Sequence, residues 1–143
     1  QPSSIYYKSG VQLIMEIQTH QEIDRGLCGD PVELGDGYAV VEMTFPERTR
    51  ADATGLVHGG FVFGLADYAA MLAVNKPTVV LAAAEVSFKK PVLAGHTVRA
   101  RADIVSVQGK KHTVSVRVVR GDEIVFEGAF SCVVPERHVT EER

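Results

Sequence analysis

The sequence has few cysteines and no long apolar run. Its two cysteines, Cys28 and Cys132, fit no metal-binding spacing and are too few to crosslink a small secreted domain. The longest mostly apolar stretch, residues 61–74, contains a glycine and an aspartate and is too short to cross a bilayer. Residues 1–10 lack the pattern of a secretory signal. We therefore expect a cytoplasmic protein with reduced thiols and no membrane partner.

An excess of positive charge is also missing. The formal net charge is -3, and acidic and basic residues are interspersed along the chain. Such a surface is unsuited to neutralising a nucleic-acid backbone, so we expect no nucleic-acid partner. The histidines are dispersed without the spacing of metal ligands, and we expect no metal site. They are His20, His58, His96, His112 and His138.

The length and the composition are those of one folded domain. The chain has 143 residues, of which 45% are hydrophobic and 23% are charged, as in ordinary folded proteins. A chain of this size buries enough surface for a single core. It contains no internal repeat and no linker-like stretch. We predict one domain over residues 1–143, with frayed ends at residues 1–10 and 136–143.

The first third of the chain gives one clear strand signal. Side chains alternate in character over residues 38–45, between an Asp36-Gly37 turn signal and a proline, and this pattern predicts a strand. The residues before it are ambiguous. Residues 12–18 fit a strand, and residues 22–28 fit a helical turn.

The remainder predicts one helix followed by four strands. Residues 61–74 are rich in alanine, leucine and methionine and apolar on all sides, which indicates an enclosed helix that ends before Pro77. Short connections that contain glycine favour antiparallel pairing of the strands that follow. These strands are predicted at residues 78–88, 97–107, 112–120 and 123–134. The fold class is therefore α+β, with an antiparallel sheet wrapped around a long central helix.

One carboxylate, Asp67, stands in this apolar helix. A carboxylate that leaves water without a partner costs several kcal/mol or becomes protonated. One interpretation places Asp67 at a wet edge, or beside a backbone amide or a basic side chain. The other makes it a general base or nucleophile in a cleft, where burial raises its basicity. Asp67 by itself does not decide between them.

A His58-Gly59-Gly60 triplet precedes the helix. Two glycines leave backbone N–H groups uncovered at the positive end of the helix dipole, where a developing oxyanion is stabilised. Gly60 is then a candidate for contact with the substrate. The alternative is that the glycines only permit a tight turn and that His58 packs as an ordinary polar residue. We expect His58 to position a neighbour rather than to titrate.

The spacing between these residues has a geometric consequence. Eight residues separate Gly59 from Asp67, which is roughly 12 Å along one helix, so they cannot both reach one carbonyl group. Two helices that pack antiparallel across a twofold axis bring Gly59 of one beside Asp67 of the other. Gly64, Ala66 and Ala70 are expected to allow the close approach. Catalysis by these groups therefore requires a dimer.

Residues 55–70, GLVHGGFVFGLADYAA, followed by VSFKKP at residues 86–91, resemble the PaaI-type hotdog thioesterases of the 4-hydroxybenzoyl-CoA thioesterase superfamily. The specific part is HGG with an aspartate nine positions after the histidine. The resemblance implies a hotdog fold and hydrolysis of an acyl-CoA to free acid and coenzyme A, at sites shared across a homodimer or a dimer of dimers. It implies Asp67 as the catalytic carboxylate, Gly59 as the amide that polarises the carbonyl and His58 as an orienting neighbour. No cofactor is implied, because coenzyme A is part of the substrate.

Two positions depart from that family pattern. Asp52 stands where the family often has an asparagine that helps to hold the water or the carbonyl, so Asp52 is a candidate for substrate binding that either raises the pKa of Asp67 or points into solvent. Residues 81–84 are Leu-Ala-Ala-Ala where some members have serine or threonine. Lys89 and Lys90 are candidates to meet the coenzyme A phosphates, the alternative being an ordinary solvated strand end.

Two rival functions share the expected fold. One is a non-catalytic acyl-CoA sensor, similar to the ligand domain of the malonyl-CoA-responsive repressor of bacterial lipid synthesis. The absence of an evident helix-turn-helix extension and the presence of Asp67 favour the enzyme. The other is a hotdog hydratase or dehydratase, which needs a separate acid-base pair of a histidine with an aspartate or glutamate. The sequence does not identify such a pair.

Overall fold

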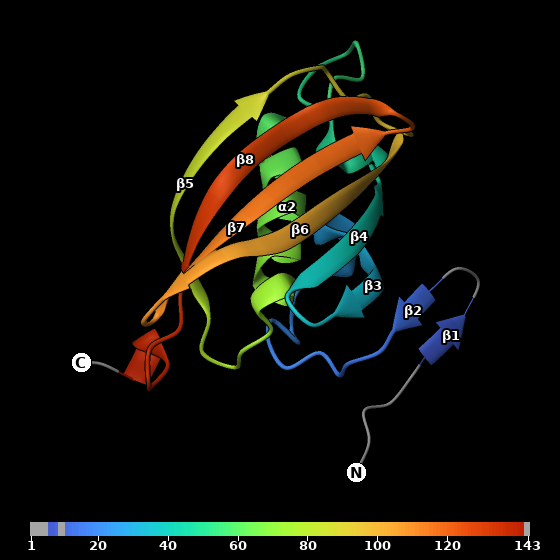
Figure 1. Ribbon diagram of the computed structural model, residues 1–143. Helices are drawn as coiled ribbons and strands as arrows, with labels where there is room; N and C mark the ends of the chain where they lie inside the picture. The colour runs from blue at the N-terminus through green and yellow to red at the C-terminus, as the bar shows by residue number, and fades with distance from the viewer. Residues whose placement is uncertain (1–5, 9–10, 142–143) are drawn as a thin grey trace.

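A computed structural model describes residues 6–8 and 11–141 of the chain. Within them, the strands form one sheet with the order β1-β2-β3-β4-β6-β7-β8-β5. The part from β3 to β5 curves around helix α2 (Gly59–Val74), while β1 and β2 lie to one side (Figure 1). The strands are β1 (Tyr6–Lys8), β2 (Val11–Leu13), β3 (Asp30–Gly35), β4 (Tyr38–Thr44), β5 (Val80–Phe88), β6 (Thr97–Gln108), β7 (Lys111–Arg120) and β8 (Glu123–Val133). The short helical elements are α1 (Arg25–Cys28), η1 (Glu47–Thr49) and η2 (Val139–Glu141).

The predicted α+β class is confirmed. Neighbouring strands run antiparallel, except that β2 and β3 pair in parallel. The inner side of the sheet carries the alternating valines and alanines of β6 and β7, and these residues are buried against α2: Val98, Ala100, Ala102, Val114, Val116 and Val118. Each side chain of valine size that leaves water contributes about 1.5–3 kcal/mol. The alternation therefore fixes which side of the sheet faces the helix.

Helix α2 is enclosed over most of its length, as predicted. It begins two residues earlier than expected, because Gly59 and Gly60 already have helical geometry. It ends at Asn75, which has the left-handed conformation (φ 51°) that closes a helix. The Asn75 side chain accepts a hydrogen bond from the Gln18 N–H and donates one to the Glu16 carbonyl, both 2.8 Å long. The segment before α1 is thereby fastened to the end of the central helix.

Strand β3 was not predicted. Pro31 and Gly35 resemble turn residues in the sequence, yet they lie in a strand that pairs with β4 and that has a register shift between Pro31 and Glu33. A proline is compatible with a strand at such an irregularity. In the ambiguous region before it, only Val11–Leu13 forms a strand. The helical turn is Arg25–Cys28, capped by the Asp24 side chain, which accepts from the Gly26 N–H at 2.8 Å.

The two ends contain some regular structure. Strand β1 lies within residues 1–10, and η2 lies within residues 136–143, the segments for which we expected fraying. The other residues of 1–10 and residues 142–143 lie outside the described part of the chain. None of the helices formed by residues 6–8 and 11–141 has the length and apolar character needed to cross a membrane.

Candidate active site

One side of the first two turns of α2 is only partly covered by the described residues. Gly60, Phe63, Gly64 and Asp67 are three or four residues apart and so lie along one side of the helix. Gly60 is exposed, and the other three are half-buried. A Cβ atom added to Gly64 would meet nothing within 4 Å. We call these four residues the open face of α2.

The open face is narrower than the sequence suggested. Ala66 and Ala70 are fully buried in the core of their own chain, so the prediction that they allow a neighbouring backbone to approach is wrong. Both side chains belong to the hydrophobic core that joins α2 to the rest of the chain. Gly64 alone of the three predicted residues is open to a neighbour.

Asp67 is buried enough to change its chemistry. Its Oδ1 atom is out of contact with solvent and has no hydrogen-bond partner among the described residues. Burial raises the pKa of this carboxyl group from 3.8 to about 6, because the charged form loses its hydration. One interpretation of the sequence placed Asp67 beside a basic side chain or a backbone amide. Among the described residues, neither kind of group binds this oxygen. The carboxyl group therefore changes its charge closer to neutral pH than an ordinary aspartate does.

Two thiols lie near Asp67. Burial raises the pKa of Cys132 to about 12, and the negative charge of Asp67 contributes to the rise. Burial also raises the pKa of Cys28, with further contributions from Asp24 and Asp67. Both thiols are thus kept protonated and are poor nucleophiles at neutral pH.

The amides at the start of α2 are free. The N-cap residue His58 makes no side-chain capping bond, and the Phe61 N–H donates to the His58 carbonyl at 3.0 Å. In the described part of the chain, the N–H groups of Gly59 and Gly60 donate to no backbone or side-chain acceptor. They remain available for an oxygen atom of a ligand at the positive end of the helix dipole.

His58 is placed as a neighbour of these amides. Its ring is exposed and meets the Phe61 ring edge-on, with centroids 6.1 Å apart. A Cβ atom at Gly60 would lie 3.1 Å from two atoms of the His58 ring. The ring therefore sits beside the backbone of Gly60, which is compatible with the predicted orienting role.

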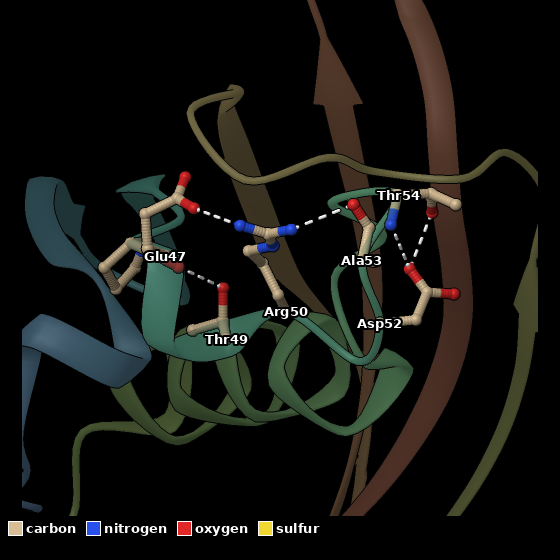
Figure 2. Close-up of polar contacts among 7 residues, drawn as sticks. Glu47, Thr49, Arg50, Asp52, Ala53 and Thr54 are labelled. Carbon is tan, nitrogen blue, oxygen red and sulfur yellow. Dashed lines mark hydrogen bonds and ion pairs between the residues drawn. The ribbon is translucent and has the colours of Figure 1, made fainter.

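The loop before the triplet is held by its own polar contacts (Figure 2). Arg50 binds the Glu47 carboxylate at 2.7 Å and the Ala53 carbonyl at 3.0 Å. The Thr49 hydroxyl donates to the Pro46 carbonyl, and the Thr49 carbonyl accepts from the His58 N–H at 3.0 Å. These bonds fix the entry of the chain into α2.

Asp52 takes part in this loop rather than in the environment of Asp67. Its Oδ1 atom accepts from the Thr54 N–H at 2.9 Å and from the Thr54 hydroxyl at 2.6 Å, and its side chain is exposed (Figure 2). The hydroxyl bond from Thr54 lowers the pKa of Asp52. The pKa of Asp67 is raised by burial, with no contribution from Asp52. Of the two alternatives for Asp52, the structure supports the one that points into solvent.

A pocket of about 280 Å³ opens beside Gly59. Its walls are mainly apolar, and they include Val62 of the helix, Phe88 at the end of β5 and Val125 of β8. Lys89 and Lys90 lie on its rim. Sequence reasoning missed Phe88 as a wall of this pocket. The sequence signal for Phe88 was its position directly before Lys89 and Lys90.

The two rim lysines face acidic residues of β8. The Lys89 ammonium lies 3.5 Å from the Glu127 carboxylate, and that of Lys90 lies 3.8 Å from Glu123. All four side chains are substantially exposed, so these ion pairs contribute little to stability. Another anion can therefore replace the glutamate carboxylates as partner of the lysines. Contact of the lysines with coenzyme A phosphates stays a prediction.

One chain brings together only part of the predicted site. His58, Gly59 and Gly60 share one end of α2, close to Lys89 and Lys90, while Asp67 lies two turns further along the helix. No cluster of three or more histidine, cysteine, aspartate or glutamate side chains suited to a metal ion occurs in the described ranges. What the site offers is a carboxyl group, free amides and an apolar pocket.

Residues 54–127, about half of the chain, match the family described as the Thioesterase superfamily. The chain belongs to this superfamily. Its fold is the hotdog fold, a central helix against a mostly antiparallel sheet. It is 52% identical to an uncharacterised protein from Pyrococcus horikoshii, with a TM-score of 0.87 over 88% of this chain and 97% of that one.

Three further proteins are also similar to this chain. A variant of the phenylacetic acid degradation protein PaaI from Thermus thermophilus is 31% identical, with a TM-score of 0.70 over 76% of this chain and 95% of that one. Methylthioribose-1-phosphate isomerase of Aquifex aeolicus is 49% identical over 83% of this chain. Transcription factor FapR of Caldanaerobacter subterraneus subsp. tengcongensis is 27% identical over 78%. The chain spans only 26% of that isomerase and 56% of FapR.

Proposed function

We propose that this superfamily member is a PaaI-type acyl-CoA thioesterase that hydrolyses its substrate at two sites shared across a homodimer. The observation that carries the proposal is the buried Oδ1 atom of Asp67, which has no partner in the described chain and lies on the open face of α2. An unpaired buried carboxyl oxygen destabilises a fold, so its presence is best explained by a role in chemistry. Membership of the Thioesterase superfamily supports this reaction.

The proposed reaction uses water as the second reactant. The Asp67 carboxylate accepts a proton as a water oxygen attacks the thioester carbonyl carbon, and the carbonyl electron pair moves to its oxygen. The Gly59 N–H of the partner subunit donates to this oxyanion, with Gly60 beside it. The tetrahedral intermediate then collapses, the carbon–sulfur bond breaks, and the proton goes from Asp67 to the coenzyme A sulfur. The products are the free acid and coenzyme A.

The dimer follows from the distance along the helix. Asp67 and Gly59 of one chain are roughly 12 Å apart, so one carbonyl group cannot contact both. Antiparallel contact of two open faces at Gly64 brings each Asp67 to the glycine amides of the other chain. Strand β5 also favours a second copy, because it is the last strand of the sheet and pairs only with β8 in the described structure. An unpaired edge of this kind is a ready surface for association.

The direct test is a panel of acyl-CoAs of different size, assayed by a thiol-trapping dye. We expect release of coenzyme A from at least one of them at a rate proportional to enzyme concentration. The Asp67→Asn protein serves as the matched control, because it differs by one atom and keeps the shape of the site. Release that continues unchanged in this control would assign the activity to other groups.

A second function is favoured by the similarity to FapR, which is named a transcription factor. In that case the site binds an acyl-CoA without cleaving it. The same panel separates the two functions: tight binding, measured by calorimetry, without release of coenzyme A supports the sensor. Asp67 favours the enzyme, since a site that only binds has no need of a raised pKa at an unpaired carboxyl group.

A mixed dimer tests whether the sites are shared. One subunit carries Asp67→Asn and the other carries Gly59→Pro, which removes the N–H at a helix position where proline is tolerated. Each homodimer should be inactive. The heterodimer retains one intact composite site, so about half of the wild-type activity should return in tagged, purified heterodimer.

The control for the glycine change is Gly59→Ala, which keeps the N–H. Its Cβ atom would lie 3.2 Å from the Phe88 ring, a contact that a small movement of the exposed ring relieves. This variant should retain far more activity than Gly59→Pro. A heterodimer that forms correctly and stays inactive would contradict the shared geometry.

A further inference from the structure

The Phe88 side chain lies beside Gly59, the residue whose N–H binds the substrate carbonyl in the proposed function. Phe88 is the last residue of β5, and its ring carbon Cε2 lies 3.2 Å from the position that a Gly59 Cβ atom would occupy. The ring also lines the pocket beside Gly59. Because Gly59 and Phe88 line the same pocket, a group that occupies this pocket next to Gly59 also lies next to the ring.

The ring is held on one side by the core of its own chain. Phe126, fully buried in β8, meets it edge-on with centroids 5.1 Å apart. The backbone just after it is fixed too, because the N–H groups of Lys89 and Lys90 both donate to the Val125 carbonyl. In the single chain, 55% of Phe88 is exposed. The Phe88 ring is therefore positioned by Phe126 but is not part of the buried core.

The rest of the pocket is rigid by comparison. Val57, Val62, Val92 and Val125 line it and are all buried core residues, so their side chains cannot move without disturbing the packing. The volume of about 280 Å³ is just below the usual range of small-molecule sites, which begins at about 300 Å³. Its mainly apolar walls suit a hydrocarbon group better than the polar amides of the pantetheine arm.

We infer that Phe88 is the specificity-determining residue of this site, and that its ring restricts the substrate to compact, unbranched acyl groups. The inference rests on the proposed function, because it places the acyl group in the pocket beside Gly59. Phe88 itself takes no part in proton transfer. It acts by excluding branched or aromatic groups at the carbon next to the thioester carbonyl.

The test compares acetyl-CoA and butyryl-CoA with benzoyl-CoA in Phe88→Ala. The change opens the pocket, and the ratio of kcat/KM for benzoyl-CoA to that for butyryl-CoA should rise at least about tenfold, the effect expected when a hydrophobic pocket gains space. Phe88→Leu should give an intermediate ratio. Val107→Ala is the matched control, since Val107 is equally exposed at 55% and lies on β6, away from the pocket, and it should leave the ratio unchanged.

Affinities measured by calorimetry for the same substrates test the role of Phe88 independently of the proposed hydrolysis. No coenzyme A release from any substrate contradicts hydrolysis, while a shift of the affinity ratio in Phe88→Ala still supports the assignment of the pocket. An unchanged ratio of both rates and affinities in a folded Phe88→Ala dimer overturns the inference. So does an equal loss on every substrate, which would show a general structural role.

Discussion

Asp67→Asn should abolish most of the hydrolysis and at the same time stabilise the protein. A positioned general base contributes about 10²- to 10⁴-fold to a rate, so kcat should fall by that range. Stability should change the other way, because the asparagine carries no charge that must lose its hydration. The pKa of Asp67 rises from 3.8 to about 6 on folding, which corresponds to up to about 3 kcal/mol that the fold loses when the group is ionised.

The stability gain has a pH dependence that identifies its cause. Below pH 3.8, Asp67 is protonated in both the folded and the unfolded state, and the substitution should have little effect. Between pH 3.8 and about 6 the unfolded chain ionises first, so the wild type loses stability relative to the variant. Denaturant unfolding at pH 8 should show the full difference. Equal stabilities of the two proteins at pH 8 would mean that the carboxylate is satisfied in the assembled protein.

The activity of the wild type should rise with pH through about 6 and then level off. The base must be ionised to accept a proton, so at pH 5 about one tenth of the sites are competent. The expected result is a roughly tenfold increase in kcat/KM between pH 5 and the plateau, measured in buffers of constant ionic strength. We expect this rise in activity well above the ordinary aspartate pKa, because burial raises the pKa of Asp67.

His58 provides the control for the assignment of that pKa. His58 lies beside the Gly60 backbone at the start of α2, so its part in the pH dependence is tested separately. In His58→Gln the ring is replaced by a side chain that does not titrate. The pH midpoint should stay where it is, and only the plateau should fall if His58 orients its neighbours. A midpoint that disappears in His58→Gln would show that Asp67 does not set the pH dependence.

Much of the fold was predictable because its signals are local. The alternation of β6 and β7, the apolar helix and the short glycine-containing connections each depend on residues close in sequence. Strand β3 was missed for the converse reason. Its Pro31 and Gly35 favour a turn locally, and only pairing with β4 across an irregular register makes the segment a strand.

The candidate site divides in the same way. The sequence by itself determined that a carboxylate would stand in an apolar helix nine positions after His58, and that two glycines would open that helix. It also set the length of helix between Gly59 and Asp67, because the rise per residue of a helix is constant. From these facts alone a shared site between two copies was predictable.

The tertiary structure decided what surrounds those residues. It left the Asp67 oxygen buried without a partner among the described residues, turned Asp52 toward Thr54, and set the Phe88 ring over Gly59. These outcomes depend on how the sheet curves around the helix and on which side of each strand faces inward. Such contacts join residues far apart in the chain, and no local pattern encodes the distance between them.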